Sequence, residues 1–364
     1  MKLTITQENF KKALTTVSRV AANKTNLPIL NNLLIYTDAN RLILNSTNMD
    51  IAVSENISAK IEKDGKVVIP AKLITEFITN LPKININLEL INSKLNIQAG
   101  NYKSIINTIN PRDFPEIPRI KKAEKITLNI KDFKNIVSQT TNITSNDISR
   151  QILTGVYIYT DGDNLYFVAT DGYRLAEKQI NNIKNSNIKA IIPASTLNIV
   201  NQSISDDLDS LSILINNDQI SFILGNIEIT SRLISGSFID YKGLIPSKNE
   251  NYFTVSKDEF LRTVKISELF ARETAGVITI KINEKKKNII VQSIASEFGE
   301  NTSELEVDVI GVAEISLNAK YLIEALNCLN SENIKFSFNG KLAPILLEGI
   351  EDSNYKHIIM PTKS

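Results

Sequence analysis

The chain carries the same stretch of sequence three times, and this internal repeat constrains its fold more than any other feature. A strand-like segment leads into an amphipathic helix over residues 3–14, again over 128–137, and again over 253–264. Each copy has a phenylalanine at the same point of the helix, namely Phe10, Phe133 and Phe260. One supersecondary unit has therefore been copied along the chain.

A second landmark keeps step with the first. Residues 68–74, 191–197 and 315–322 each run from a strand into a helix, and each begins about 60 residues after the phenylalanine landmark of its copy. Asp113-Phe-Pro115 closes the first copy, residues 237–241 close the second, and the third ends more weakly at 354–361. Polar segments of linker composition follow the first two copies. We predict three homologous domains, over residues 1–120, 121–248 and 249–364.

Each copy contains the order strand, helix, several strands twice. Alternating strand runs are separated by turn signals such as Asp64-Gly65. The turn at Asp161-Gly-Asp163 is not a calcium loop, because Gly172 stands where the bidentate Glu would be needed. Lys285–Lys287 lies between two strand runs and is predicted to be a hairpin tip. The predicted fold is α+β, with two helices and two antiparallel β layers in each domain.

Composition limits the possible functions. Lys plus Arg number 41 and Asp plus Glu 40, so the net charge of +1 argues against a protein that coats nucleic acid over its whole surface. Cys328 and His357 are the only residues of their types, which excludes thiolate or histidine metal clusters and leaves little basis for histidine catalysis. We expect Cys328 to be a core thiol.

No apolar run approaches the roughly 18 residues of a membrane span, and no signal segment is visible, so we expect a cytoplasmic protein.

The predicted helices keep one face apolar and the other mildly basic. Phe10, Ala13, Leu14 and Val17 share a face in the first helix, while Lys11, Lys12, Thr15 and Arg19 lie away from it. The second helices are expected to bury Leu73, Phe77 and Leu81, or Leu322, Leu326 and Leu329, and to expose Lys72 or Lys320. A solvated face explains any one helix, but the same sign in all copies suggests a surface for a polyanion.

Linked homologous domains form either an open array or a closed ring. If the helices line the hole at about 10 Å each, six of them put their axes on a circle roughly 19 Å across, which is too narrow for duplex DNA. Twelve helices from two chains leave a clear hole of about 28 Å by the same reasoning. A ring around DNA would therefore be a head-to-tail dimer.

Four segments resemble the β subunit of bacterial DNA polymerase III, the replicative sliding clamp family. They are Leu-Pro-Ile-Leu-Asn-Asn-Leu-Leu at 27–34, Asp113-Phe-Pro115, Ala-Thr-Asp-Gly-Tyr-Arg-Leu-Ala at 169–176 and Ile359-Met-Pro361. The resemblance implies a non-catalytic processivity factor without cofactors: a homodimeric ring that encircles double-stranded DNA without reading its sequence. Its implied partners are the polymerase α subunit, the clamp loader, other polymerases and repair proteins, bound through short linear motifs. Weak phosphate contacts suit such a ring because they allow sliding.

The resemblance, together with the basic helix faces, implies three sets of site residues. A peptide-binding groove would use Leu153, Thr170, Gly172, Tyr173, Arg174, Leu175, Ile239, Gly243, Leu244, Pro344, Ile358, Ile359, Met360 and Pro361. For DNA contact the resemblance supplies Lys24, and the basic helix faces described above supply Lys12, Arg19, Lys134, Arg262 and Lys265, with Arg150 as a further candidate. The dimer interface would use Lys72, Ser104 and Ile106 against Leu269, Phe270, Glu297, Glu300 and Glu304.

The chain departs from the family at two groove positions. Ile239 stands where relatives often have proline, and Gly243 where they often have a basic residue. Two other functions stay open at this point. One is a metal-dependent DNA-processing enzyme using carboxylates such as Asp171, which the lack of a repeated second carboxylate argues against. The other is a repeat scaffold unrelated to DNA.

Overall fold

The structure is a computed structural model that describes residues 1–21, 27–118, 120, 122–183, 187–246, 248–295 and 299–362. In this part of the chain all strand pairs are antiparallel and belong to four sheets. The chain divides into two compact units. Unit 1 comprises Met1–Phe133 with Ser195–Leu233, and unit 2 comprises Lys134–Ala194 with Ile234–Ser364.

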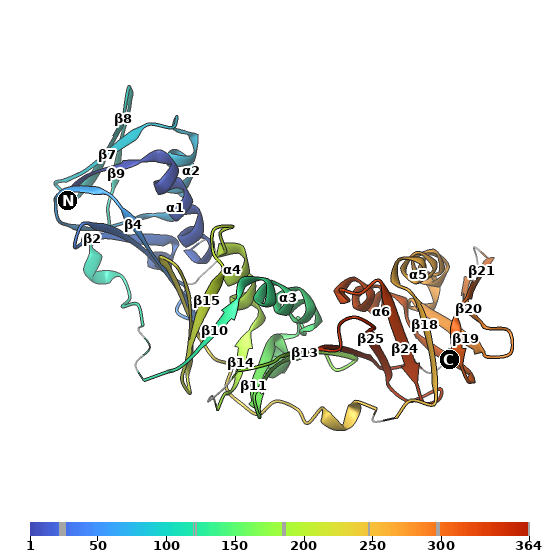
Figure 1. Cartoon of the computed structure of the whole chain (residues 1–364). Coiled ribbons are helices and arrows are strands. Elements are labelled where there is room, and N and C mark those ends of the chain that lie inside the picture. The colour runs from blue at the N-terminus through green and yellow to red at the C-terminus, as the bar shows by residue number, and fades with distance from the viewer. Residues whose placement is uncertain are drawn as a thin grey trace. The chain divides into compact units, whose positions relative to one another are not determined.

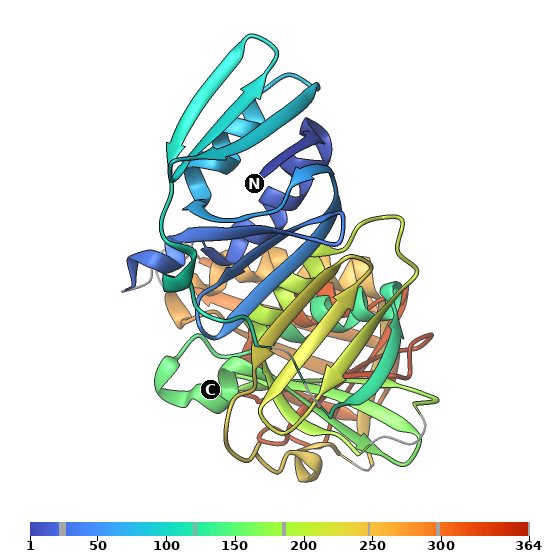
Figure 2. The same ribbon diagram turned by 90° about the vertical axis from the view of Figure 1, so that its left-hand side faces the viewer.

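Unit 1 contains a five-stranded and an eight-stranded sheet. The five-stranded sheet has the order β5 (Lys60–Lys63), β1 (Lys2–Thr6), β7 (Asn85–Ile91), β8 (Lys94–Ala99) and β9 (Tyr102–Asn107), and Figure 2 shows its cyan β7–β9 meander. The eight-stranded sheet has the order β10 (Glu124–Asn129), β15 (Ser210–Ile215), β16 (Gln219–Leu224), β17 (Ile227–Arg232), β4 (Ile51–Ser58), β3 (Arg41–Thr47), β2 (Asn32–Asp38) and β6 (Lys66–Pro70).

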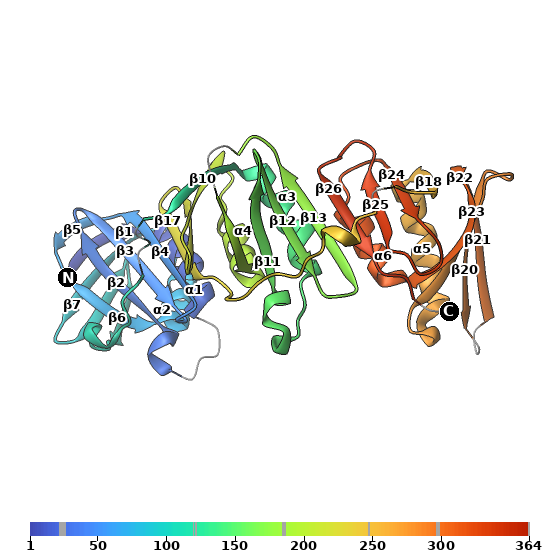
Figure 3. The same ribbon diagram turned by 90° about the horizontal axis from the view of Figure 1, so that it is seen from below.

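Unit 2 contains a nine-stranded and a four-stranded sheet. The nine-stranded sheet has the order β14 (Lys189–Pro193), β11 (Gly155–Asp161), β12 (Asn164–Thr170), β13 (Arg174–Ile180), β26 (Tyr355–Ile359), β25 (Ile345–Gly349), β24 (Asn333–Phe338), β18 (Asn251–Ser256) and β22 (Asp308–Ile310). The strands from β11 to β22 are labelled in Figure 3. The other has the order β21 (Gly299–Glu306), β20 (Asn288–Ala295), β19 (Val277–Asn283) and β23 (Val312–Asn318).

The sequence repeats are present, but neighbouring repeats share their sheets. β17 of the second repeat pairs with β4 of the first, with Thr230 opposite Ala52. β26 of the third repeat pairs with β13 of the second, with Ile358 opposite Leu175. The backbone N–H and C=O groups at the edge of one repeat's sheet bond to a strand of the neighbouring repeat, so each large sheet continues across a repeat boundary.

Each half of each repeat has one α-helix directly after a strand, as predicted, which gives six α-helices. Their bounds are α1 (Gln7–Ala21), α2 (Ala71–Asn80), α3 (Ile130–Thr140), α4 (Ala194–Ser203), α5 (Lys257–Ala271) and α6 (Ala319–Cys328) in the described residues (Figure 1). Short 3-10 helices are η1 (Pro28–Asn31), η2 (Pro111–Asp113), η3 (Thr141–Ile143), η4 (Ile148–Thr154), η5 (Lys242–Leu244) and η6 (Arg272–Thr274). No described helix is long and apolar enough to cross a membrane.

The cores confirm most of the predicted helix faces. In unit 1, α1 packs on α2 and on β3 and β4, and the predicted stripe from Phe10 to Val17 is buried. In unit 2, α5 packs on α6 and β20, and the Phe260 ring meets the edges of Phe253 and Phe336. The basic residues predicted on α3 and α5, Lys134, Arg262 and Lys265, are exposed.

The prediction for α2 was wrong. Ala71, Ile74 and Ile78 form its buried stripe, whereas Leu73 is 51% exposed and Phe77 is only half-buried. The helix begins directly at Ala71, so the buried positions follow the spacing i, i+3, i+7 from that residue. Of the predicted residues only Leu81, just after the helix, is buried.

Both predicted hairpin turns are present. Asp161–Asp163 joins β11 to β12, and Lys285–Lys287 joins β19 to β20. Cys328 is a buried free thiol, as expected.

Candidate functional site

The segment Thr170-Asp-Gly-Tyr-Arg174 forms a tight turn at the end of β12 in unit 2. Asp171 accepts hydrogen bonds from the backbone nitrogens of Tyr173 (2.9 Å) and Arg174 (3.1 Å). Thr170 accepts one from the Gly172 nitrogen at 3.1 Å and donates to the Arg174 carbonyl at 2.6 Å. Gly172 has φ 96°, a conformation that costs other residues free energy. Thr170, Asp171 and Gly172 therefore each suit the geometry of this turn.

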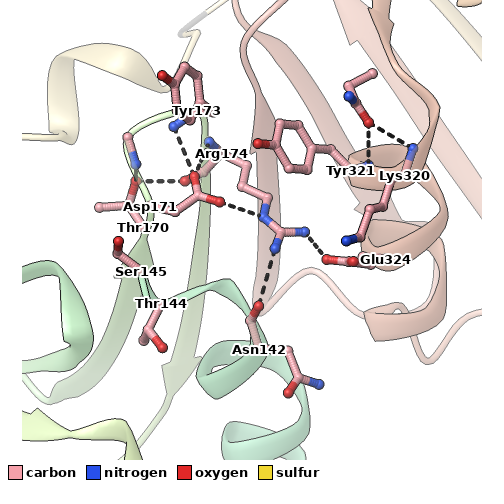
Figure 4. Close-up of polar contacts among 12 residues, drawn as sticks. Asn142, Thr144, Ser145, Thr170, Asp171, Tyr173, Arg174, Lys320, Tyr321 and Glu324 are labelled. Atoms are coloured by element: carbon pink, nitrogen blue, oxygen red, sulfur yellow. Dashed lines mark hydrogen bonds and ion pairs between the residues drawn. The ribbon is translucent and has the colours of Figure 1, made fainter. Parts of the chain in front are cut away.

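The Arg174 side chain is 8% exposed and has a partner for every part of its guanidinium group. Its Nε donates to Asp171 Oδ2 at 3.0 Å, Nη1 donates to Glu324 of α6, and Nη2 donates to the Asn142 carbonyl at 3.2 Å (Figure 4). The guanidinium carbon lies 4.7 Å from the centre of the Tyr321 ring. Arg174 thus links the second repeat to the third within unit 2.

Burial alone would lower the pKa of Arg174, but its hydrogen bond to Glu324 and the charges of Glu324 and Asp171 raise it above the ordinary value. A buried cation with this set of acceptors is fixed in one geometry. Arg174 is therefore placed to position the turn and helix α6, and only a small part of it can meet a ligand.

Two tyrosines flank this cluster at the surface. The Tyr173 and Tyr321 rings are stacked with centroids 6.4 Å apart, and Tyr173 is 59% exposed. Asn318 caps α6 by accepting from the Lys320 nitrogen at 2.9 Å, which fixes the first turn that carries Tyr321. The Met360 nitrogen donates to the Tyr173 carbonyl at 2.8 Å and ties the C-terminal segment to the same turn.

A buried aromatic cluster lies on the same sheet. Its buried members are Tyr159, Val168, Leu175, Tyr241, Leu346 and Ile358. The Tyr159 and Tyr241 hydroxyls are 2.7 Å apart, and Tyr241 donates to the buried Glu177 carboxylate. Burial, followed by this hydrogen bond to Glu177, raises the pKa of Tyr241, so its hydroxyl stays neutral. Two predicted groove residues, Leu175 and Ile358, are therefore core residues here.

The fourteen predicted groove residues all lie in unit 2, and their side chains differ in burial. The buried ones are Leu153, Thr170, Arg174, Leu175, Ile358 and Ile359. Pro344, Met360 and Pro361 are half-buried. The exposed ones are Gly172, Tyr173, Ile239, Gly243 and Leu244. We call the exposed and half-buried members the junction surface. No atom lies within 4 Å of the position that a Gly243 side chain would occupy. The glycine therefore removes a side chain that could extend toward a ligand, and it leaves the packing of the fold unchanged.

Sequence reasoning missed Tyr321, Glu324 and the Tyr159–Tyr241–Glu177 chain. Tyr321 lies in the second landmark of the third repeat, on the half-exposed side of α6, so comparison of the repeats could have indicated it. Glu324 is 150 residues from Arg174, and no local pattern could pair them.

The predicted DNA-contact residues are divided between the two units. In unit 1, Lys12 is exposed on α1 and lines a hollow of about 440 Å³ together with Lys11, Lys83 and residues 202–205. Arg19 is less free than expected, because it donates to the Gln202 carbonyl and to Ser203 at 3.4 Å, at the end of α4. Burial lowers the pKa of the Arg19 guanidinium. The helix end attracts this cation.

Of the remaining DNA candidates, Lys24 lies outside the described residues. In unit 2 Arg150 donates to the Asp171 carbonyl at 3.1 Å, so it contacts the turn described above. Lys134, Arg262 and Lys265 are exposed on α3 and α5.

The predicted dimer residues lie on sheet edges and helices of the two units. Ser104 and Ile106 are on the edge strand β9, but the Ile106 side chain is buried and its neighbour Ile105 is 64% exposed. The alternation of a strand explains this one-residue difference. Lys72 lies 4.0 Å from Glu76 of its own helix. Leu269 is 56% exposed and Phe270 half-buried on α5, while Glu300 and Glu304 are exposed on the edge strand β21. Glu297 lies outside the described residues.

No cluster of three or more His, Cys, Asp or Glu side chains able to hold a metal ion occurs among the described residues. His357 is fully buried and its pKa is lowered to about 3 by burial and then by the Arg174 charge, which leaves it neutral. These observations describe a three-repeat α+β clamp fold with a polar turn and an apolar surface where repeats meet.

Comparison with known proteins agrees. The chain matches the N-terminal domain of the DNA polymerase III beta subunit over residues 1–118, the central domain over 127–240 and the C-terminal domain over 242–363. It is 26% identical to proteins named beta sliding clamp from Staphylococcus epidermidis and Staphylococcus aureus, over 100% of both chains.

Solved structures agree over the whole chain. The DNA polymerase sliding clamp of Bacillus subtilis is 25% identical with a TM-score of 0.96, covering 100% of this chain and 99% of that one. The DNA polymerase III beta chain of Streptococcus pneumoniae is 26% identical with a TM-score of 0.94, covering 100% of both. The chain belongs to the DNA polymerase III beta subunit family. Neither a DNA-processing enzyme nor an unrelated scaffold finds support in these similarities.

Proposed function

We propose that this chain is the processivity clamp of a replicative DNA polymerase, closing with a second copy into a ring around duplex DNA. The observation that carries the proposal is that all three repeats match the beta subunit family from end to end. A ring holds DNA by topology, so each phosphate contact can stay weak and the ring can slide. No catalytic step is needed, and the site of action would be the cytoplasm, where the replicating duplex is.

The junction surface of unit 2 is the proposed docking site for short motifs of the polymerase α subunit, the clamp loader and repair proteins. Its exposed apolar side chains, Ile239 and Leu244, suit anchor residues of an extended peptide. Tyr173 adds an aromatic face, and Arg174 holds the turn that carries it. The missing basic side chain at Gly243 predicts a preference for apolar over acidic peptides.

For ring closure, the exposed edges β9 and β21 are the proposed pairing strands. Both are edge strands of their own sheets, with unpaired backbone groups available to a partner. Glu300 and Glu304 on β21 would meet Lys72 of the other copy. A solution mass of twice the 40.6 kDa chain at micromolar concentration is the expected result. A stable monomer there would contradict the proposal.

The test of encirclement uses DNA topology. With its cognate clamp loader and ATP, the protein should remain on nicked circular DNA through gel filtration and should be lost when the circle is linearised. Equal retention on both forms, or on neither, would refute a topological clamp. For the docking site, Leu244→Ser should weaken binding of the polymerase α subunit, while Ile350→Ser, at a residue 53% exposed away from the junction surface, should not.

A further inference from the structure

The turn at Thr170–Arg174 has a structural copy in unit 1 that the sequence does not make obvious. Thr47 accepts from the Met49 nitrogen at 3.0 Å and donates to the Ile51 carbonyl at 3.0 Å. Asn48 accepts from the nitrogens of Asp50 (3.1 Å) and Ile51 (2.8 Å), as Asp171 does in unit 2. Met49 has φ 78°, matching the positive φ of Gly172.

The surroundings of the two turns also match. The Arg232 nitrogen donates to the Asp50 carbonyl at 2.9 Å, as that of Met360 does to Tyr173. Ala52 lies opposite Thr230 in the sheet register, as Leu175 lies opposite Ile358. Unit 1 therefore contains the same arrangement of turn, sheet and returning strand as the junction surface.

The two copies differ in what fills the space above the sheet. In unit 2 that space holds the stacked rings of Phe238, Tyr157, Tyr159 and Tyr166, with neighbouring centroids 4.8 to 5.1 Å apart. In unit 1, Phe114 packs on Leu34 and Val68. A hollow of about 340 Å³ lies beside this contact, and a second of about 130 Å³ adjoins it. Ala52, Glu116, Pro118 and Thr230 line both.

The lining of the unit 1 hollows is polar and carries an excess of acid. The charged residues that line them are Asp50, Glu116, Glu228, Lys66 and Arg232, three acids against two bases. Glu228 is half-buried and uses one carboxylate oxygen to accept from Ser221 at 2.9 Å. The Lys66 ammonium lies 5.8 Å from the ring centre of Tyr36, and both residues line the larger hollow. Asn45 and Thr230, 5% and 3% exposed, add amide and hydroxyl groups.

We propose that the unit 1 hollows form a second docking site, which takes an extended peptide segment of a partner protein and accepts its lysine or arginine side chain toward Glu116 and Glu228. Charge complementarity selects this occupant, because a cation would offset the acidic excess and a carboxylate would add to it. The inference rests on the proposed function in one step, namely that this repeat position in unit 2 docks peptides.

The test is methyl NMR on the full-length protein with isoleucine labels. Ile43 and Ile117 line the larger hollow and report on unit 1, while Ile239 reports on the junction surface of unit 2. The probes are three acetylated, amidated pentapeptides, Ser-Leu-X-Leu-Ser, with X lysine, norleucine or glutamate. We expect saturable shifts of Ile43 and Ile117 with the lysine peptide, and weak or no shifts with the other two.

Two variants and a matched control complete the design. Glu228→Gln keeps the shape and should weaken the lysine peptide about tenfold, the loss expected for a charged hydrogen bond. Ser54→Phe should block the hollow sterically. The control is Lys356→Gln in unit 2. Lys356 pairs with Glu177 in the sheet register, at the position that Glu228, opposite Ser54, holds in unit 1. This control should leave the unit 1 shifts unchanged.

Absence of unit 1 shifts at millimolar lysine peptide, equal binding of the glutamate peptide, or an unaffected Glu228→Gln variant would overturn the inference. These outcomes are separate from failure of the proposed function, which is read from DNA retention and from binding of the polymerase α subunit by unit 2.

Discussion

The buried His357 gives a quantitative prediction because it is the only histidine in the chain. It lies on β26, and its Nδ1 is 2.8 Å from the Tyr355 hydroxyl, which donates to the Gln139 carbonyl at 3.3 Å. The tyrosine has one proton to give, and with that proton on the Gln139 carbonyl the donor to the Tyr355 oxygen is Nδ1–H, which is the tautomer we predict. Nε2 is buried and has no hydrogen-bond partner in the described residues. Protonation would thus place an unpaired charge in the core.

The sign of the pH effect follows from linkage. The pKa is lowered from 6.5 to about 3 in the folded chain, by burial and then by Arg174. At pH 7.5 the histidine is neutral in both states and contributes nothing. As the pH falls below 6.5 the unfolded chain gains the proton and the folded chain does not, so stability falls by about 1.4 kcal/mol per pH unit. Between pH 7.5 and 5 the loss should be about 2 kcal/mol.

The assay is direct. In protein labelled at the histidine Cε1, the single ring resonance should keep its position from pH 8 to pH 5, and the nitrogen shifts should indicate the Nδ1–H tautomer. Urea unfolding of unit 2 should become easier over the same range, and His357→Gln should flatten that dependence. A titration midpoint near 6.5 in the folded protein, or an Nε2–H tautomer, would refute the reasoning.

Three further changes test other parts of the structure. Arg174→Ala strands the Asp171 and Glu324 carboxylates and should cost about 3 kcal/mol in the stability of unit 2, read from amide exchange in β13 and α6; unchanged exchange would deny it a positioning role. Gly172→Ala, at φ 96°, should cost about 1–2 kcal/mol in thermal stability; a neutral effect would show that the turn tolerates a side chain. Lys12→Glu should reduce the amount of protein loaded onto circular DNA, more at low salt, with binding of the polymerase α subunit unchanged; loss of both would indicate misfolding.

The repeat made much of the fold predictable from sequence. The buried faces of α1, α3 and α5 follow from a phenylalanine that recurs at one helical position beside lysines or arginines, so the contrast between faces is sharp. In α2 the sequence offers two neighbouring apolar stripes, and Leu73 and Phe77 belong to the one that is not buried. Only the packing of the whole unit decides which apolar stripe is buried.

Long-range pairings could not be predicted. Strand alternation says which side chains share a face but not which strand lies alongside, so the joining of neighbouring repeats in one sheet was unexpected. The hydrogen bond from Arg174 to Glu324 could not be predicted for the same reason, because it joins residues 150 positions apart. The turn at Thr47–Ile51 was within reach, because Thr followed by Asn or Asp at the same repeat position is a turn signal.

Continuous sheets across the repeat boundaries restrict how this gene can be dissected. A fragment ending at residue 120 would keep β4 and lose β17, and one starting at residue 249 would keep β26 and lose β13. Each truncation would leave a long edge strand whose backbone N–H and C=O groups have no partner. Individual repeats should therefore precipitate when expressed alone. Recombination that exchanges single repeats should be disfavoured, even though the three repeats have the same element order.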